Sequence, residues 1–272
     1  MRGNVHVRFG GRAGETGRSK GRNRASVRPY YEKVRQGARI VSQAAVVAVG
    51  VRDTGEKSVL GLAIGASETE AFWLEFCRSL SRRGLSGVQL VISDAHEGLR
   101  SALSQVFAGA TWQRCKVHFL RNVASAVPKL HAPAVLAVVK SIFLQPTRET
   151  ARDAVHHALG VLEPRFPAVA AKLRAAESDV LAYLDFPVDH WRSISSTNAI
   201  ERVNAELDRR AKVVDIFPNT ASLLRLFTAV LQDQHDEWQD GRRHFSQQSM
   251  ARVMHPDGPP LLTNPLTEGL VA

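Results

Sequence analysis

The sequence predicts an α/β protein in which helices flank a sheet and an all-helical block interrupts it. Apolar, β-branched runs at 39–51 and 58–64 flank a turn-forming segment at 52–55 and predict a β-hairpin. The apolar run Val88–Ile92 has the continuous pattern of a strand that is buried on both faces. Between residues 119 and 185, apolar residues recur at helical spacing, and prolines divide the region into separate helices.

A helix is expected between the hairpin and the buried strand. Ser67 and Glu70 have the spacing of a capping box, and Gly84 is a stop signal. Between them, large apolar residues recur every four positions, at Phe72, Phe76 and Leu80. After the buried strand, the pattern predicts a helix over 95–107 and a short strand over 111–117.

Two helices are expected after the all-helical block, where the chain returns to the sheet. The first begins near Asn198 and the second spans 222–238, and the proline-containing segment after His255 is expected to be extended. We therefore divide the chain into four parts: a disordered basic leader (1–28), a sheet core (29–118 and 191–243), a helical insertion (119–190) and an extended tail (244–272).

The composition excludes several classes of protein. The 272 residues include only two cysteines, which are too few for a disulfide framework or a self-contained cysteine-rich zinc site. The longest apolar run, Ala44–Val51, is far shorter than the roughly 20 residues of a membrane span. No positively charged, then apolar, signal segment opens the chain. We expect a cytoplasmic protein with no membrane partner.

The net charge of +10 makes a polyanion the first partner to consider, and it is unevenly distributed. Residues 1–28 carry eight basic residues and one acid, so they account for seven of the ten net charges. This stretch is poor in large apolar side chains and is typical of a flexible arm. It could bind nucleic acid, act as a transit peptide, or be a solvated or foreign leader. Its six glycines argue against the amphipathic helix of a transit peptide.

Two carboxylates stand at positions that suit either chemistry or helix capping. Asp94 follows the buried strand at its carboxyl end, where ligands bind in α/β sheets. With Glu97 it also has the N-cap and N3 spacing of the next helix. Glu201 has the same ambiguity, because Asn198 and Glu201 are spaced as a capping pair. Taken singly, neither residue settles the choice between the two roles.

Five sequence words, taken together, carry a resemblance to a known family. In chain order they are YEKVRQGARIVSQAAVVAVGV, SETEAFW, LVISDAHEGLRSAL, TWQRCKVHFLRN and SSTNAIERVNAELDRRAKVVDIFPN. In this order and spacing they closely resemble the Mutator-like DDE transposases of bacterial insertion sequences. The resemblance covers residues 30–243, which is most of the chain.

The resemblance implies a ribonuclease H-like core with a helical insertion, acting on DNA in transposition. In such a core, three acids hold two divalent ions, Mg²⁺ or Mn²⁺, for strand cleavage and joining. The second acid corresponds to Asp94 and the third to Glu201, and carboxylate oxygens suit these hard ions. The implied partners are double-stranded DNA at element ends and a second copy or a full-length transposase, in the nucleoid of a bacterial cytoplasm.

The family's Cys-x-x-His pair corresponds to Cys115 and His118. One thiol and one imidazole supply half of a zinc shell, so we interpret the pair as active-site architecture or a DNA contact; a packed cysteine is the alternative. Basic residues that could contact phosphates flank the pair and follow Glu201, although solvated helix faces would also explain them. They are Arg114, Lys116 and Arg121, then Arg202, Arg209, Arg210 and Lys212.

The chain departs from the family at the first catalytic acid. That acid lies four residues before Glu32, a position that Arg28 occupies here. Glu32 is on the same strand face but about 13 Å further along, too far to share an ion. Asp53 has the typical role of a turn former. A guanidinium at position 28 would repel a cation.

These observations leave an enzyme and a binding module as the main hypotheses. The first is a transposase copy, truncated or frame-disrupted at its start, whose catalysis is impaired by Arg28. The second is a non-catalytic remnant that binds DNA or oligomerises with a full-length transposase. A third interpretation, an RNA-binding tail on an unrelated α/β scaffold, is disfavoured by the five matching words.

Overall fold

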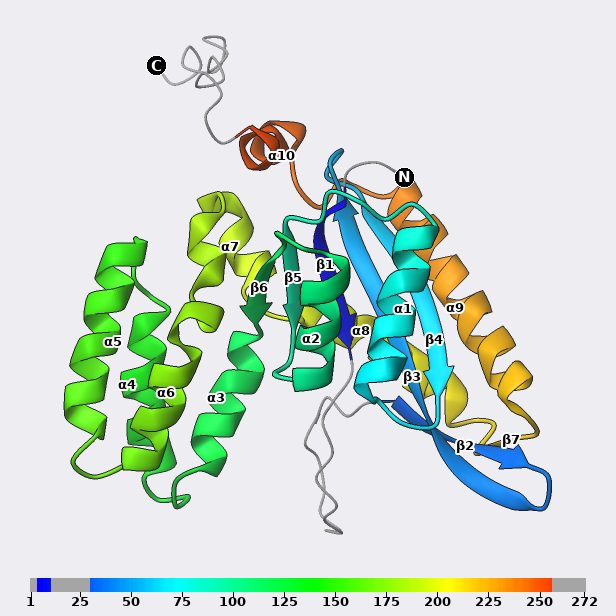
Figure 1. Ribbon diagram of the computed structural model, residues 1–272, viewed down its shortest axis with the longest axis horizontal. Helices are drawn as coiled ribbons and strands as arrows, with labels where there is room; N and C mark the ends of the chain where they lie inside the picture. The colour runs from blue at the N-terminus through cyan, green and yellow to red at the C-terminus, as the bar shows by residue number, and fades with distance from the viewer. Residues whose placement is uncertain (1–3, 11–29, 256–272) are drawn as a thin grey trace, which may run out of the picture.

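The computed structural model describes residues 4–10 and 30–255, which form a sheet with helices on both faces and a separate group of helices along one edge (Figure 1). The described sheet has seven strands in the order β6-β5-β1-β3-β2-β7, with β4 paired to β3. The strands are β1 (Asn4–Gly10), β2 (Tyr30–Gln36), β3 (Arg39–Arg52), β4 (Lys57–Gly65), β5 (Leu90–Ser93), β6 (Thr111–Arg114) and β7 (Ile216–Phe217).

The predicted hairpin is confirmed as β3 and β4, which pair antiparallel. Its turn contains Gly55, whose φ of 84° favours glycine. The Gly55 carbonyl accepts hydrogen bonds from the backbone N–H groups of His244 and Phe245, at 2.9 and 3.1 Å. A Cβ at position 55 would lie 2.0 Å from the Phe245 carbonyl oxygen. Glycine therefore lets the segment after α9 (Thr220–Asp240) dock on the hairpin turn.

Helices cover the two faces of the sheet with separate apolar clusters. On one face lie α1 (Glu70–Arg82) and α2 (Glu97–Val106), whose buried side chains pack on Val46 and Val91. On the other face lie α8 (Asn198–Ala211) and α9 (Thr220–Asp240), which pack on Val47 and other residues of β3. The predicted α/β class, with helices returning to the sheet after the helical block, is therefore observed.

The helical block lies along the β6 edge of the sheet (Figure 1). It contains α3 (Lys116–Ser125), α4 (Ala132–Ile142), α5 (Arg148–Leu162), α6 (Pro167–Val180), the 3-10 turn η1 (Ala182–Asp185) and α7 (Val188–Ile194). The fully buried Gln113 of β6 ties the block to the sheet. Its Nε2 donates to the Val180 carbonyl at 3.1 Å, and its Oε1 accepts from the Tyr183 N–H at 2.7 Å.

Two segments differ from the predicted organisation. Residues 1–28 were expected to form a disordered leader, but residues 4–10 form β1 inside the sheet. Residues 11–28, including Arg28, lie outside the described part of the chain. The tail over 244–272 was expected to be extended, but α10 (Gln247–Met254) lies within it. An N-cap at Ser246, whose Oγ accepts from the Ser249 N–H at 3.1 Å, starts this helix.

The caps of α1 and α2 each lie two residues after the predicted ones. Thr69, not Ser67, caps α1, and its side chain accepts from the Phe72 N–H at 3.2 Å. His96, not Asp94, caps α2 through Nδ1, which accepts from the Leu99 N–H at 3.2 Å. Neither predicted capping box forms, because a neighbouring acceptor reaches the free N–H groups instead.

None of the helices in the described ranges is both long enough and apolar enough to cross a membrane.

Candidate active site

Asp94 lies just beyond the carboxyl end of β5, in the loop that leads to α2. Because His96 caps α2, the Asp94 side chain is not used as a cap. Its carboxylate, 13% exposed, instead forms an ion pair with His118, between Oδ1 and Nδ1. The structure therefore excludes the Asp94 side chain as the cap of α2 and pairs its carboxylate with His118.

His118 lies in the first turn of α3 and is buried. Burial alone would lower its pKa, but contacts with the Asp94 carboxylate and Cys115 outweigh burial and raise the pKa to about 9. Nη1 of Arg121, one turn further along the helix, lies 3.4 Å from Nε2. A cationic imidazole at neutral pH offsets the Asp94 charge and fixes the orientation of that carboxylate.

Cys115 joins β6 to α3 and is fully buried. Its sulfur lies 3.4 Å from the backbone nitrogen of Thr197 and 3.3 Å from the Thr197 hydroxyl, and both groups can donate to it. Burial would raise the pKa of the thiol, but hydrogen bonds from His118 and Thr197 and the charge of His118 outweigh burial and lower it. Cys115 is therefore a polar contact within the site and not merely a packed apolar residue.

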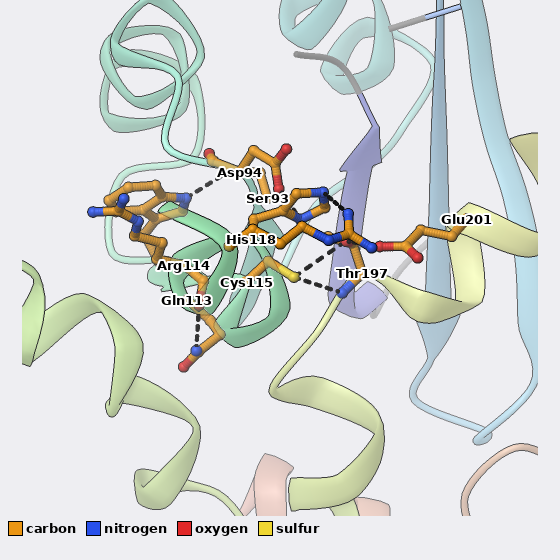
Figure 2. Close-up of polar contacts among 10 residues, drawn as sticks. Ser93, Asp94, Gln113, Arg114, Cys115, His118, Thr197 and Glu201 are labelled. Carbon is orange, nitrogen blue, oxygen red and sulfur yellow. Dashed lines mark hydrogen bonds and ion pairs between the residues drawn. The ribbon is translucent and has the colours of Figure 1, made fainter. Parts of the chain in front are cut away.

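Thr197 connects this cluster to Glu201. Its Oγ1 lies 3.3 Å from Glu201 Oε1 and also 3.3 Å from the Cys115 sulfur, so its single proton can be donated to either. Asn198 is not the cap of α8, because the N-cap position is occupied by Thr197. The Thr197 side chain makes no capping hydrogen bond to the helix backbone. The contacts run from Asp94 through His118, Cys115 and Thr197 to Glu201. Figure 2 shows these five side chains near one another, with the two contacts between Cys115 and Thr197 drawn as dashed lines.

Two backbone hydrogen bonds support this path. The Cys115 N–H donates to the Ser93 carbonyl at 2.8 Å, and the Lys116 N–H donates to the Ser195 carbonyl at 3.0 Å. The start of α3 is therefore fixed both to the end of β5 and to the segment before α8. Both predicted acids are thus anchored to the same helix start.

The donor set around Asp94 does not match a complete two-ion site. Among the described residues, one cluster brings together three metal-binding donors, Asp94, Cys115 and His118, whose donor atoms lie within 4.8 Å of one another. Carboxylate, thiol and imidazole suit zinc better than magnesium, but Nδ1 of His118 is already paired with Asp94. No described cluster combines Asp94 and Glu201 with a third carboxylate.

The predicted basic residues separate into two groups. Arg114, Lys116 and Arg121 lie at the end of β6 and in α3, close to Cys115 and His118. Arg209 and Arg210 lie about 12 Å further along α8 than Glu201, and both pair with Glu206, at 2.6 and 2.8 Å. Lys212 likewise pairs with Asp208. The second group forms a solvated, ion-paired helix end.

Arg202 instead lines a cavity at the start of α8. The cavity has a volume of about 380 Å³, and Lys57 and Arg192 also line it. None of its lining residues is acidic. Lys57 Nζ lies 5.5 Å above the Trp238 ring, which forms another wall. These cations come from β4, α7 and α8, so only the fold brings them together.

Sequence reasoning missed three contributors to the site. Thr197 was part of a matching sequence word, but its link to Cys115 spans 82 residues. The Ser93 hydroxyl donates to the Asp94 carbonyl at 2.9 Å and accepts from Trp112 Nε1 at 2.9 Å. The cationic cavity left no local signal, because Lys57 and Arg192 are far apart in the sequence.

Comparison with known proteins identifies relatives over most of the chain. The family described as "Transposase, Mutator family" matches residues 27–241. The transposase for insertion sequence element IS1081 of Mycobacterium tuberculosis is 43% identical over 221 residues, 81% of this chain and 53% of the relative. The transposase for IS256 in transposon Tn4001 of Staphylococcus aureus is 40% identical over 210 residues, 76% of this chain and 54% of the relative. The chain therefore spans about half the length of these curated relatives.

Proposed function

The chain belongs to the Mutator family of transposases, and from that premise we propose that it binds element-end DNA through a ribonuclease H-like core whose acidic site is impaired in strand cleavage and joining. The observation that carries this proposal is the contact path joining Asp94 to Glu201 through His118, Cys115 and Thr197. It supports the pairing of these two acids in one site, as the family resemblance implies.

In the proposed mechanism, Asp94 and Glu201 are two of the three carboxylates that would hold Mg²⁺ or Mn²⁺. The bound ions would supply activation of the attacking oxygen and stabilisation of the leaving oxygen. His118 orients the Asp94 carboxylate, and Thr197 orients that of Glu201. The described residues do not supply the third carboxylate beside them, and the proposed impairment rests on this shortage.

DNA binding is the part of the function that these residues still support. The cavity lined by Lys57, Arg192 and Arg202 presents positive charge beside the helix that carries Glu201. Phosphate oxygens are the natural partners of such a surface. The cavity therefore supports DNA binding, which is also what the second candidate function requires: a non-catalytic protein that occupies element ends.

The test uses the purified full chain and a plasmid that carries the DNA flanking its gene on both sides. We expect salt-dependent binding and no nicking when Mg²⁺ or Mn²⁺ is added. Nicking that Asp94→Ala abolishes, while the exposed-site control Asp240→Ala retains it, would show that catalysis is intact. Absence of both binding and nicking would refute the transposition role itself.

A further inference from the structure

Strand β1 fills the position between β3 and β5 in the described sheet. It pairs antiparallel with β3 and parallel with β5, the strand that leads to Asp94. Residues 4–9, Asn-Val-His-Val-Arg-Phe, alternate polar and apolar residues with the period of a strand. This segment lies outside residues 27–241, which match the family, yet it completes the sheet beside the site.

β1 and β2 lie end to end along the same edge of β3. Strand β4 pairs with β3 over residues 44–51 and so occupies one edge of β3. On the opposite edge, residues 44 and 45 of β3 pair with β2, and residues 47–51 pair with β1. β1 ends with Gly10 opposite Val47, and β2 begins with Tyr30 opposite Ala45. The two segments therefore form one interrupted strand.

The register of β2 identifies the place that the missing acid would take. Tyr30 lies opposite Ala45, and each step back along an antiparallel strand advances the partner by one residue. A residue two positions before Tyr30, the position that the resemblance assigns to the first acid, therefore belongs opposite Val47. Gly10 occupies that place. Arg28 itself lies outside the described residues.

The pairing with β5 leads to the same position. Arg8 lies level with Ile92 in the parallel pair. Two further residues along each strand bring Gly10 level with Asp94. Because two independent registers agree, position 10 is the point of β1 that lies beside Asp94.

Position 10 also lies on the face of the sheet that carries Glu201. Residues directly opposite one another in an antiparallel pair share a face, so position 10 shares the face of Val47. Val47 packs in one apolar cluster with Ile200 and Val203 of α8. Glu201 lies between these two residues in the same helix, and α8 contacts β1. Figure 2 shows β1 passing between Asp94 and Glu201.

We propose that Gly10 stands in the place of the first metal-binding acid, so that β1 supplies the strand but not the carboxylate. Neighbouring strands are about 4.8 Å apart, so carboxylates at positions 10 and 94 can share an ion. Glu32, about 13 Å along the strand from position 28, cannot. Gly10→Asp is then the single substitution that completes a three-carboxylate site. That the site would hold Mg²⁺ or Mn²⁺ rests on the proposed function.

The first test measures Mn²⁺ binding to the purified full chain by electron paramagnetic resonance of free Mn²⁺. We expect Gly10→Asp to bind Mn²⁺ at least tenfold more tightly than wild type. Gly10→Asn, of the same size but uncharged, should stay within twofold of wild type, and Gly10→Asp with Asp94→Asn should lose the gain. Tighter binding by Arg28→Asp and not by Gly10→Asp would overturn the inference.

A second test examines the register without a new carboxylate. Cysteines at positions 10 and 47 should form a disulfide with oxidised glutathione, because opposite residues on antiparallel strands have the required Cα separation. Cysteines at positions 28 and 47 should not, as mass spectrometry of peptides would reveal. A 28–47 disulfide formed in place of a 10–47 disulfide would refute the assignment of Gly10.

These readouts separate the inference from the proposed function. Tight Mn²⁺ binding by Gly10→Asp without any DNA binding would support the site and refute the transposition role. DNA binding by wild type, with no gain of Mn²⁺ affinity in the folded Gly10→Asp variant, would refute the inference and leave the proposed function standing. Circular dichroism shows whether each variant is folded. If Gly10→Asp is not folded, the disulfide test decides whether the assignment of Gly10 is correct.

Discussion

The hydroxyl of Thr197 lies 3.3 Å from the carboxylate of Glu201 and equally close to the sulfur of Cys115. This hydroxyl joins the α8 side of the site to the β6–α3 side, where His118 pairs with Asp94. Two acids separated by more than 100 residues are thereby held in one network of side-chain contacts. Such a network tolerates loss of a member poorly, because buried polar groups are costly to leave unpaired.

Thr197→Val should destabilise the protein by about 1–2 kcal/mol, because valine keeps the volume but removes the buried donor. Urea unfolding followed by circular dichroism measures this free energy. Thr228→Val is the matched control: Thr228 is an exposed residue of α9, so its substitution should change the free energy by less than about 0.5 kcal/mol. Equal effects of the two substitutions would show that the Thr197 contacts contribute nothing specific.

Gln113→Leu should be more damaging, by about 2–4 kcal/mol. The substitution leaves the Val180 carbonyl and the Tyr183 N–H without the side-chain partner that each now has. Both groups belong to the helical block, so its attachment to β6 should weaken. Hydrogen exchange should speed up at η1 in particular. Gln232→Leu, at an exposed position of α9, serves as the control and should leave both quantities unchanged.

The elements that sequence reasoning predicted are those with a strong local signal. The hairpin and the helices of the block follow from runs and periodicities that extend over many residues. Strand β1 was missed because its alternation covers only residues 4–9, and the glycine and arginine content of residues 1–28 obscured it. Its place between β3 and β5 depends on partners more than 35 residues away.

The candidate site was predicted only in part, because its members with a local sequence signal could be recognised and those brought together by the fold could not. Asp94 and Glu201 are recognisable from the words around them, and the structure brings their immediate partners together. Capping was harder to predict, because several acceptors near a helix start compete for the same N–H groups. The cationic cavity combines residues from three elements, so no local pattern could indicate it.

Stability should fall as the pH decreases from about 6.5 towards 4, because of His190. This histidine is fully buried, stacks on Phe245 and lies 2.9 Å from Ser249 Oγ. Burial lowers its pKa from 6.5 to about 4, although Asp189 opposes this. In this range the unfolded chain binds a proton that the folded protein does not, so acid favours unfolding.

The comparison of wild type with His190→Gln isolates this effect. Glutamine can still hydrogen-bond to Ser249 but does not titrate. Between pH 7 and pH 5, the unfolding free energy of wild type minus that of the variant should decrease by about 1–2 kcal/mol. A difference that is the same at both pH values would contradict the lowered pKa of His190. Other titrating groups, including His118, are common to both proteins and cancel.

DNA affinity should depend on the cations that line the cavity. In Arg192→Gln with Arg202→Gln, the slope of log affinity against log salt should decrease by about 0.9 for each phosphate that the protein no longer neutralises. Fluorescence anisotropy with a labelled duplex measures this slope. The salt concentration is varied from roughly 50 to 200 mM, where contacts between the protein and phosphates dominate the affinity. Arg165→Gln, an exposed arginine between α5 and α6, should leave it unchanged. A double variant with an unaltered salt slope would show that the DNA passes elsewhere on the protein.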